Sequence, residues 1–514
     1  MSMAVTDVVV VGAGHNGLIT AGYLTKRGFK VIIVEQAAEP GGCVKTVELF
    51  KGFKVNLYSF EQYLIHSTPV IQDLELVKYG LKYYQVDPVI FSPFPDGNYI
   101  LFYRDLEKTI RQISKLSFHD AVSYRKLAQT FEEINSLLAQ LALIPPLSFK
   151  EIIDFAETAG RGDLLQIILA SAKDILDEYF ETDYVKVPIA FLGAAAIGLP
   201  PSQKGTGWTV GWHLNARNLA RPYGGSAALI DSLVKMIKAH GGELMLNSEV
   251  TKIKVKDGKA SGVKLSNGFE IETKIVVAAC DPKQTFLKLV GEENLDSDFV
   301  SEVKKIKVAN GIAMKADFSL DGLPSYVCNP SVGVNECHKA ATFIAPSVDT
   351  LEKAYDEYKF GKNPKEPGLM VSIPSASDPS LSPPDKHILS LETRYTPYEL
   401  SGGERWDDIK NQVAEHLLDL YSIYAPDVKK LVVQKYVASP VDWERELKLP
   451  RGNFFHVDMT LDQMFALRPH PRLNRYRTPI RGLYITGAGT HPGGGVSGAP
   501  GYNAAMTILN DLGS

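Results

Sequence analysis

The feature that most constrains the fold of this chain is a glycine turn between a buried strand and a helix near its N-terminus. An apolar run, Val8 to Val11, leads into Gly12-Ala13-Gly14-His15-Asn16-Gly17, and a helical stretch follows that stops at Gly28. A second apolar run, residues 31–34, ends in Glu35. A strand, glycine turn, helix and strand in this order is the context in which G-x-G-x-x-G indicates dinucleotide binding.

Each residue of this unit has its own task. Gly12 makes the tight turn, Gly14 lets the backbone approach a pyrophosphate, and Gly17 lets the helix pack close to the strand. The N–H groups at the start of the helix bind the phosphate charge, and Glu35 is placed to accept from ribose hydroxyls. A glycine-rich turn without a ligand is the alternative interpretation, and the flanking strands and the acid in register argue against it.

A second glycine pair decides between the two dinucleotides that fit this unit, NAD and FAD. Gly41 and Gly42 follow Glu35 closely and bring the chain back toward the phosphates, which favours FAD. No second G-x-G-x-x-G follows a strand, so a separate domain for a nicotinamide cofactor is not predicted. The electrons of a reduced flavin must then pass to a diffusible acceptor, either oxygen or a membrane quinone.

The remaining sequence predicts an α/β chain with a discontinuous architecture. Amphipathic helical segments dominate from about residue 60 to residue 204, with Phe131 to Leu143 as an example. Ser226 is placed to cap a helix, and alternating runs from Val250 to Ile271 with Asp-Gly and Asn-Gly turns predict strands. The continuous apolar run from Ile275 to Ala279 predicts a buried strand of a parallel sheet. A second strand and glycine turn, residues 483–498, stand near the C-terminus. We expect an FAD-binding domain from residues 1–75, 205–290 and 456–514, and an α+β substrate domain with a helical part from residues 76–204 and 291–455.

Charge and cysteine content narrow the partners and the location. Lys and Arg number 55 against 59 Asp and Glu, a net charge of -4, so nucleic acid is not an expected partner. The four cysteines show no C-x-x-C spacing, so neither a metal site nor a dithiol pair is expected. Isolated thiols and an N-terminus without an export signal favour a cytoplasmic location. Val187 to Pro201 is shorter than the ~20 residues of a spanning helix, which leaves peripheral membrane association as the alternative.

Motifs spread over the whole chain resemble the bacterial phytoene desaturase and carotenoid ketolase group of FAD-dependent oxidoreductases. The resemblance is closest to cyanobacterial-type β-carotene ketolases, and a broader branch of FAD oxidoreductases with the same C-terminal motif is nearly as similar. The segments that carry it are GAGHNG with Glu35, Pro40-Gly41-Gly42, residues 200–205 (PPSQKG), 220–229 (ARPYGGSAAL), 458–464 (DMTLDQM), 478–480 (TPI) and 487–498 (GAGTHPGGGVSG).

The resemblance implies a Rossmann-like FAD-binding domain of the glutathione-reductase and amine-oxidase type and a set of cofactor residues. The implied contacts to FAD come from Gly12, Gly14, Gly17, Glu35, Gly41, Gly42, the backbone of Val250, Gly487, Ala488, Val496 and Ser497. Two positions depart from the pattern of many relatives. Cys43 stands where they carry Arg, and Ala488 stands where they carry an acid.

The activity implied by the resemblance is oxidation of a carotenoid or a related isoprenoid, a hydrophobic small molecule. Ring ketolation is the first choice and C–C desaturation by hydride transfer to the flavin is the second. A flavin oxidase of another substrate class, such as an amine, and a flavin-bound scaffold without turnover are the rival hypotheses.

Three further features have a functional and a structural interpretation each. His491 lies in the turn expected to border the flavin and is the candidate catalytic acid or base, or else a structural histidine bound to loop backbone. Cys43 is interpreted as a packed small residue in preference to a covalent flavin link. The apolar segments Leu137 to Leu147 and Val187 to Leu199 line a tunnel or contact a bilayer, or else belong to the core.

Overall fold

The glycine turn at the N-terminus belongs to a five-stranded parallel sheet that is assembled from distant parts of the chain. The structure is a computed structural model that describes residues 3–59 and 61–513. The strand order is β10-β3-β2-β14-β20, with β2 (Val8–Val11), β3 (Val31–Val34), β10 (Glu243–Met245), β14 (Ile275–Ala278) and β20 (Leu483–Ile485). The predicted strand, glycine turn, helix and strand unit is therefore present, with α1 (His15–Lys26) between β2 and β3.

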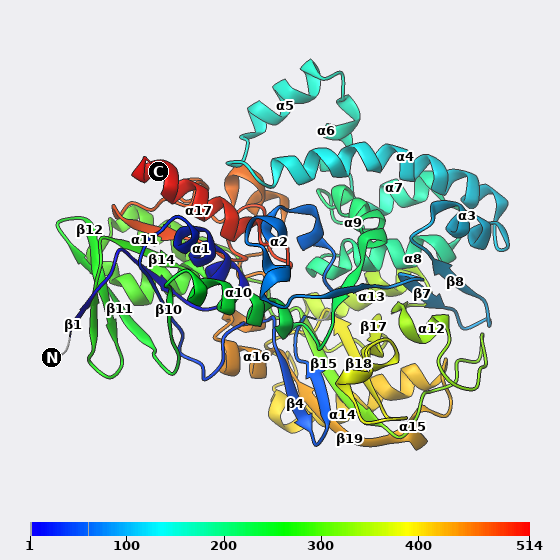
Figure 1. Cartoon of the computed structure of the whole chain (residues 1–514). Coiled ribbons are helices and arrows are strands. Elements are labelled where there is room, and N and C mark those ends of the chain that lie inside the picture. Colours follow the sequence, from blue (N-terminus) through cyan, green and yellow to red (C-terminus); the bar gives the residue numbers. More distant parts are fainter. Residues whose placement is uncertain (1–2, 60, 514) are drawn as a thin grey trace.

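Both faces of this sheet are covered, which explains why its strands are continuous apolar runs. Val8 and Val10 pack in one core with α1, α10 (Ala227–Ala239) and α17 (Ala499–Leu512). Val9 and Val11 pack in another core with a four-stranded sheet of β1 (Met3–Val5), β13 (Glu270–Glu272), β12 (Lys259–Leu265) and β11 (Val250–Lys256). The strands predicted between Val250 and Ala279 are confirmed. Figure 1 shows α17, at the C-terminal end of the chain, beside α1.

A seven-stranded mixed sheet forms the second part of the molecule (Figure 1). Its order is β19 (Val432–Ala438), β15 (Ala313–Leu320), β18 (His387–Arg394), β17 (Leu369–Ser372), β16 (Ala341–Ile344), β7 (Ile90–Pro93) and β8 (Tyr99–Phe102). One face packs Met314, Phe318 and Leu391 against α14 (Trp406–Ser422). The opposite face of β15 and β18 carries buried polar and charged side chains, Lys315, Asp317, Ser390, Glu392 and Arg394.

Helices α3 to α8 form the predicted helical part, which follows the first strands of the second sheet, and α9 extends it beyond residue 204. Strands β6 (Tyr83–Gln85), β7 and β8 interrupt the helical region that the sequence predicted from about residue 60. Such short strands show no clear period, and their pairing partners lie far away in the chain, for example Tyr83 opposite Pro222. The helices are α3 (Leu106–Ser114), α4 (Phe118–Leu141), α5 (Phe149–Thr158), α6 (Gly162–Leu169), α7 (Ala172–Tyr179), α8 (Asp183–Leu192) and α9 (Val210–Asn215).

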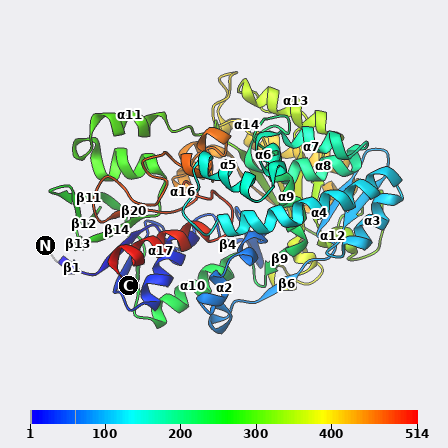
Figure 2. The same cartoon turned by 90° about the horizontal axis from the view of Figure 1, so that it is seen from above.

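The remaining strands and α-helices complete the fold. They are β4 (Thr46–Phe50), β5 (Phe53–Asn56), α2 (Val70–Asp73), β9 (Ala220–Pro222), α11 (Ser297–Lys305), α12 (Glu336–Lys339), α13 (Val348–Lys359), α15 (Val428–Leu431) and α16 (Pro440–Leu447). Seen from above, the nucleotide-binding sheet lies at one end of the molecule and α3 at the other, with α4 running between them (Figure 2). No helix in the described part of the chain is long and apolar enough to cross a membrane.

One predicted detail is wrong. Ser226 precedes α10, but its hydroxyl makes no capping bond to that helix. The Ser226 hydroxyl donates instead to the Asn56 side chain at 3.3 Å, and Asn56 also accepts the Ser226 N–H at 2.9 Å. A tertiary hydrogen bond has replaced the local one that the sequence predicted.

Candidate functional site

A large cavity of about 1060 Å³ connects the nucleotide-binding sheet with the second sheet. The glycine turns line one end, and side chains from the second sheet, the helical part and α16 line the other. This volume exceeds the roughly 300–1,000 Å³ of usual small-molecule pockets. A site that accommodates a dinucleotide together with a substrate requires such a size.

The predicted cofactor residues gather at one end of this cavity. All of them except Ser497 line it: Gly12, Gly14, Gly17, Glu35, Gly41, Gly42, Val250, Gly487, Ala488 and Val496. The Ser497 carbonyl accepts the Thr68 hydroxyl at 2.9 Å, and the Ser497 hydroxyl accepts the Ala499 N–H at 3.2 Å. The individual contacts to FAD stay predictions.

The first glycine turn has the geometry that its sequence predicted. Gly12 has φ +102°, a conformation that side chains other than glycine rarely adopt. A Cβ on Gly17 would lie 2.3 Å from the Gly12 carbonyl oxygen, so only glycine lets α1 approach this closely. A Cβ on Gly14 would have no atom of the described chain within 4 Å, so this glycine faces open space.

Glu35 and the second glycine pair hold this turn from the side. The two carboxylate oxygens of Glu35 accept the N–H groups of Ala13 at 2.8 Å and Ala37 at 2.9 Å. The Gly41 N–H donates to the Ala13 carbonyl at 2.8 Å, and a Cβ on Gly42 would lie 3.5 Å from the Gly14 Cα. The second pair therefore returns to the first turn, as predicted. The Glu35 carboxylate still has lone pairs for a ribose hydroxyl.

His491 lies outside the set of described residues that line the cavity. It is buried, and its Nε2 donates to the Leu141 carbonyl at 3.1 Å. Burial lowers the pKa of His491 to about 4, so it is neutral at pH 7. Its surroundings match the structural interpretation, and a catalytic role for His491 stays an untested prediction.

Two other histidines do line the cavity, His15 in the first glycine turn and His456. Burial is the main cause that lowers the pKa of each to about 4; a hydrogen bond with the Gly495 backbone opposes it at His15, and the Arg468 charge adds to it at His456. Among the described residues, His15 Nε2 and His456 Nδ1 are buried without a hydrogen-bond partner. These neutral imidazoles point to a ligand that satisfies them.

Arg468 donates hydrogen bonds to the backbone of the C-terminal glycine turn. Its side chain is fully buried, and its nitrogens donate only to backbone carbonyls and the Met464 sulfur within the described chain. The Ala488 carbonyl accepts at 2.6 Å, and the Phe455 and Val457 carbonyls each accept at 3.1 Å. The same side chain therefore positions Ala488 of the turn and the segment that carries His456.

The other end of the cavity is mostly apolar and aromatic. Its apolar lining comprises Ile90, Leu192, Ala196, Trp212, Ala216, Leu219, Ala341, Phe343, Met370, Trp443, Phe454 and Phe455. From the two apolar segments of the sequence, Leu192 and Ala196 reach the cavity, whereas residues 137–147 do not appear in its described lining. Cys43 also lines it, and burial raises the pKa of its thiol to about 12, so no thiolate forms at neutral pH.

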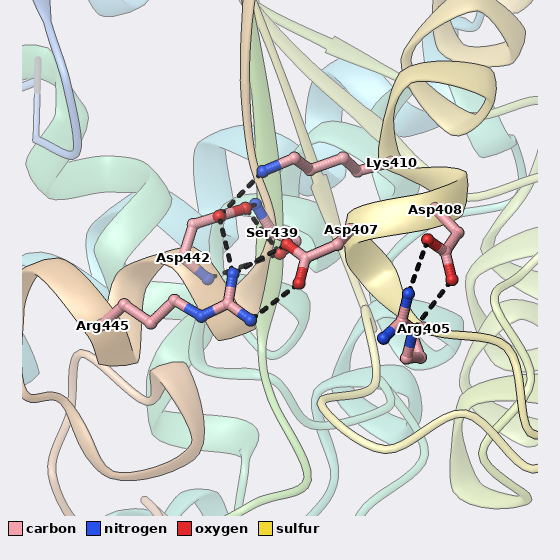
Figure 3. A network of polar contacts seen from close by, with 7 residues as sticks. All are labelled: Arg405, Asp407, Asp408, Lys410, Ser439, Asp442 and Arg445. Atoms are coloured by element: carbon pink, nitrogen blue, oxygen red, sulfur yellow. Dashed lines mark hydrogen bonds and ion pairs between the residues drawn. The ribbon is translucent and has the colours of Figure 1, made fainter.

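Helix α16 forms one wall of the cavity through Trp443, Glu446 and Leu447. Figure 3 shows how its polar side is tied to α14. Arg445 donates two bonds of 2.7 Å to Asp407, and Lys410 donates to Asp442 at 2.8 Å. Asp442 also closes a capping box with Ser439 at the start of α16. These contacts fix the helix that presents the wall residues.

The nucleotide end of the cavity fits FAD. Helix α1 begins without a side-chain cap and without an acidic side chain in its first turn, so its N–H groups are free for phosphate within the described structure. Gly14 leaves room that a Cβ would fill. The unpartnered nitrogens of His15 and His456 lie along the same wall as Gly487 and Gly495.

Comparison with known proteins also indicates a flavin-binding protein. Residues 17–307 match the family described as flavin containing amine oxidoreductase. A protein named pyridine nucleotide-disulfide oxidoreductase domain-containing protein 2, from Rattus norvegicus, is 32% identical over 98% of this chain and 94% of its own. A limonene dehydrogenase component of Castellaniella defragrans is 28% identical over 99% and 95%. The predicted likeness to phytoene desaturases is confirmed at 24% identity with the lycopene-forming enzyme of Pantoea ananas, over 98% and 99%.

Solved structures confirm the predicted fold class. An oxidoreductase from Methanosarcina mazei superposes with a TM-score of 0.65 at 17% identity, over 98% of this chain and 100% of the other. A putrescine oxidase variant superposes with a TM-score of 0.64 at 15% identity, over 99% of each. The chain belongs to the flavin containing amine oxidoreductase family, and it is an FAD-dependent oxidoreductase.

Several site residues escaped the sequence analysis. The position of His15 inside the glycine motif could have identified it as a site residue. No motif of recognised chemistry contains His456, Glu392, Arg394 or Arg468. Asp281 follows β14 and lines the cavity; burial raises the pKa of its carboxyl to about 6. The position after a buried parallel strand was the only signal for Asp281.

Proposed function

We propose that this protein oxidises a carotenoid or a related isoprenoid, by ring ketolation as first choice and C–C desaturation as second. The observation that carries the proposal is the apolar end of the cavity, which adjoins the end that fits FAD. Limonene and phytoene, named in the relatives above, are both isoprenoid hydrocarbons, which supports the same substrate class.

In this proposal the protein aligns the substrate, excludes water and handles a proton. Bound FAD supplies a two-electron acceptor for hydride from a C–H bond. The apolar walls hold an allylic C–H against the nucleotide end of the cavity and keep water away. His15 and His456 each have one ring nitrogen without a proton at pH 7. In desaturation, one carbon would lose hydride, the neighbouring carbon would lose a proton to His456 Nδ1 or His15 Nε2, and the C=C bond would form between them. In ketolation, the same nitrogens would accept the proton of the water or hydroperoxide oxygen that bonds to the oxidised carbon. His491 is the second choice, because it lies outside the described lining of the cavity.

Amine oxidation is the second candidate function, and one feature favours it. Glu446 lines the cavity beside Tyr58 and Trp443, whose ring centroids lie 5.7 Å apart, an arrangement that suits a cation. The Glu446 carboxylate, however, already accepts the hydroxyls of Tyr58 at 2.5 Å and Tyr436 at 3.1 Å. Glu61 and Glu392, further carboxylates of the substrate end, are paired with arginines. An ammonium group would therefore compete with existing partners.

Anaerobic reduction of the bound flavin tests the proposal. We expect β-carotene or phytoene in liposomes to bleach the oxidised flavin band of the purified protein and to yield a desaturated or keto product; if the oxygen atom comes from O₂, the keto product appears only on aerobic repetition. Putrescine and cyclohexylamine serve as matched amine probes. Bleaching by an amine alone would establish the second candidate, and a flavin that no substrate reduces would favour a scaffold. Restoring oxygen or a quinone to the reduced protein then identifies the acceptor, which we propose to be one of these two.

Peripheral membrane association is a further part of the proposal, because the substrates are insoluble in water. Helices α5 and α6 project from the helical part (Figure 1), and Ile144, Ile153, Phe155 and Leu169 around them are exposed. We expect the protein to float with liposomes and the double variant Phe155→Asp, Leu169→Asp to stay behind. Val433→Asp, at an apolar residue of β19 that is more exposed than Phe155 and Leu169, is the control and should float as the wild type does. A wild-type protein that remains entirely in the soluble fraction would contradict this expectation.

A further inference from the structure

We infer that Arg394 and Glu392 form a subsite for a neutral oxygen function, a hydroxyl or a carbonyl, on an otherwise apolar substrate. This inference rests on the proposed function, because it narrows the class of isoprenoid that the cavity accepts. Both residues lie on β18 and line the cavity beside Met370 and Phe454. They introduce charge into a lining that is otherwise mostly apolar at this end.

The guanidinium of Arg394 is only partly satisfied by the protein. It forms an ion pair with Glu392 through Nη1, and the two side chains are 8% and 4% exposed. The partner of Nη2 in the described structure is the Met370 sulfur at 4.0 Å, a weak acceptor. Nε is buried without a hydrogen-bond partner among the described residues. Phe454 covers one side of the guanidinium with its ring centroid 5.7 Å away.

Arg221 and Glu61 form a second buried ion pair, in which the arginine has all of its hydrogen-bond acceptors. Arg221 donates to Glu61 through Nε at 3.0 Å and through Nη2 at 2.5 Å, and its Nη1 donates to the Lys339 carbonyl at 2.9 Å. Every nitrogen of Arg221 therefore has an oxygen acceptor. Arg221 lies outside the described cavity lining, whereas Arg394 lies within it. The unused donors are found where a ligand can reach the side chain.

The charge balance selects the kind of oxygen. Glu392 neutralises the charge of Arg394. Lys315 on β15 lies opposite Glu392 in the sheet, but it already forms an ion pair with Asp317 at 2.5 Å. An added carboxylate would face Glu392 without a free positive charge to offset it. A carbonyl accepts from Arg394 without that repulsion, and a hydroxyl can also donate to Glu392. A pure hydrocarbon leaves the guanidinium donors without an acceptor, and a site built to hydrogen-bond an oxygen discriminates against such an analogue.

Binding of matched probes to the FAD-loaded protein tests this subsite without turnover. The probes are β-ionone, the alcohol β-ionol, a hydrocarbon with the same skeleton and a carboxylic acid with the same ring, and the readout is the perturbation of the flavin absorbance. We expect the ketone and the alcohol to bind roughly 10- to 100-fold more tightly than the hydrocarbon, the range for a hydrogen bond to a charged group. Equal affinity for all four, or tightest binding of the acid, would overturn the inference.

A double variant shows whether the pair causes this preference. Glu392→Leu with Arg394→Met replaces a buried ion pair by apolar side chains, a change that proteins often tolerate. We expect it to keep FAD and its affinity for the hydrocarbon and to lose the preference for the ketone and the alcohol. Glu107→Leu with Arg125→Met, an exposed pair between α3 and α4 away from the described cavity lining, is the control and should keep the preference. A double variant that still prefers the ketone would contradict the assignment to Glu392 and Arg394.

The two proposals can fail separately. If polyenes leave the flavin oxidised but the ketone preference depends on Arg394, the proposed reaction is wrong and the subsite stands. If polyenes reduce the flavin but all probes bind alike, the reaction stands and the subsite is wrong.

Discussion

Replacing Arg468 by methionine should lower the free energy of unfolding by more than about 4 kcal/mol. The side chain is fully buried and donates to six backbone carbonyls, those of Phe455, Val457, Asp458, Gln463, Ala488 and Thr490. A buried acceptor without a partner costs about 1–3 kcal/mol. Methionine fills much of the same space but restores none of these bonds, so even partial rearrangement leaves several carbonyls unsatisfied. Urea unfolding of the FAD-loaded protein measures the loss.

Two further variants complete this test. One separates the hydrogen bonds of Arg468 from its charge, and the other is a control at an exposed arginine. Arg468→Lys keeps the charge and three donors, so an intermediate loss is expected. Arg445→Met removes an exposed arginine that pairs with Asp407, and its loss should stay within about 1 kcal/mol. If Arg468→Met unfolds at the same urea concentration as the wild type, these carbonyls do not depend on the guanidinium and the structural role assigned to Arg468 is wrong.

The position of Arg468 also connects stability with the site. The carbonyls that it binds belong to the turn with Ala488 and to the segment around His456, and both segments line the cavity. A variant that folds but has lost these bonds should therefore bind less FAD. The fraction of bound flavin in Arg468→Lys, measured by its absorbance against protein concentration, reports this effect.

Local sequence patterns predicted four of the five strands of the nucleotide-binding sheet, all except β10. The apolar run before Gly12, the spacing of Gly14 and Gly17, and the acid at Glu35 define one continuous unit of strand, turn, helix and strand within the first 35 residues. The C-terminal strand and turn carry similar local signals, and β20 does complete the same sheet. Periodicity and turn chemistry report such local structure directly.

The second sheet and the polar subsite depended on contacts that no local pattern encodes. Strand β7 pairs with β16, about 250 residues away, and the short strands show no distinctive period. The sequence around Glu392 and Arg394, HILSLETR, shows alternation but does not tell which face meets the cavity. Arg468 acts through carbonyls of residues 455–490, and a carbonyl is present in every residue. The assignment of His491 followed its motif, whereas His15 and His456 are brought together by the fold.

Two alanine substitutions in the first glycine turn should separate folding from FAD binding. Gly17→Ala places a Cβ 2.3 Å from the Gly12 carbonyl oxygen and 3.0 Å from the Ala279 Cβ. Alanine normally stabilises a helix by about 1 kcal/mol over glycine, but here α1 must move off the sheet, at a cost of about 1–3 kcal/mol. We expect Gly17→Ala to lower the melting temperature even without FAD, because the clash lies within the protein itself.

Gly14→Ala should have the opposite profile. Its Cβ meets no atom of the described chain within 4 Å and Gly14 has φ -67°, so the apoprotein should keep its stability within about 0.5 kcal/mol. The added methyl group occupies the space through which the backbone approaches the pyrophosphate. Losing two charged hydrogen bonds of about 1.5 kcal/mol each lowers the affinity more than 100-fold. Titration of the apoprotein with FAD measures this loss, and wild-type affinity in Gly14→Ala would show that the phosphates bind elsewhere.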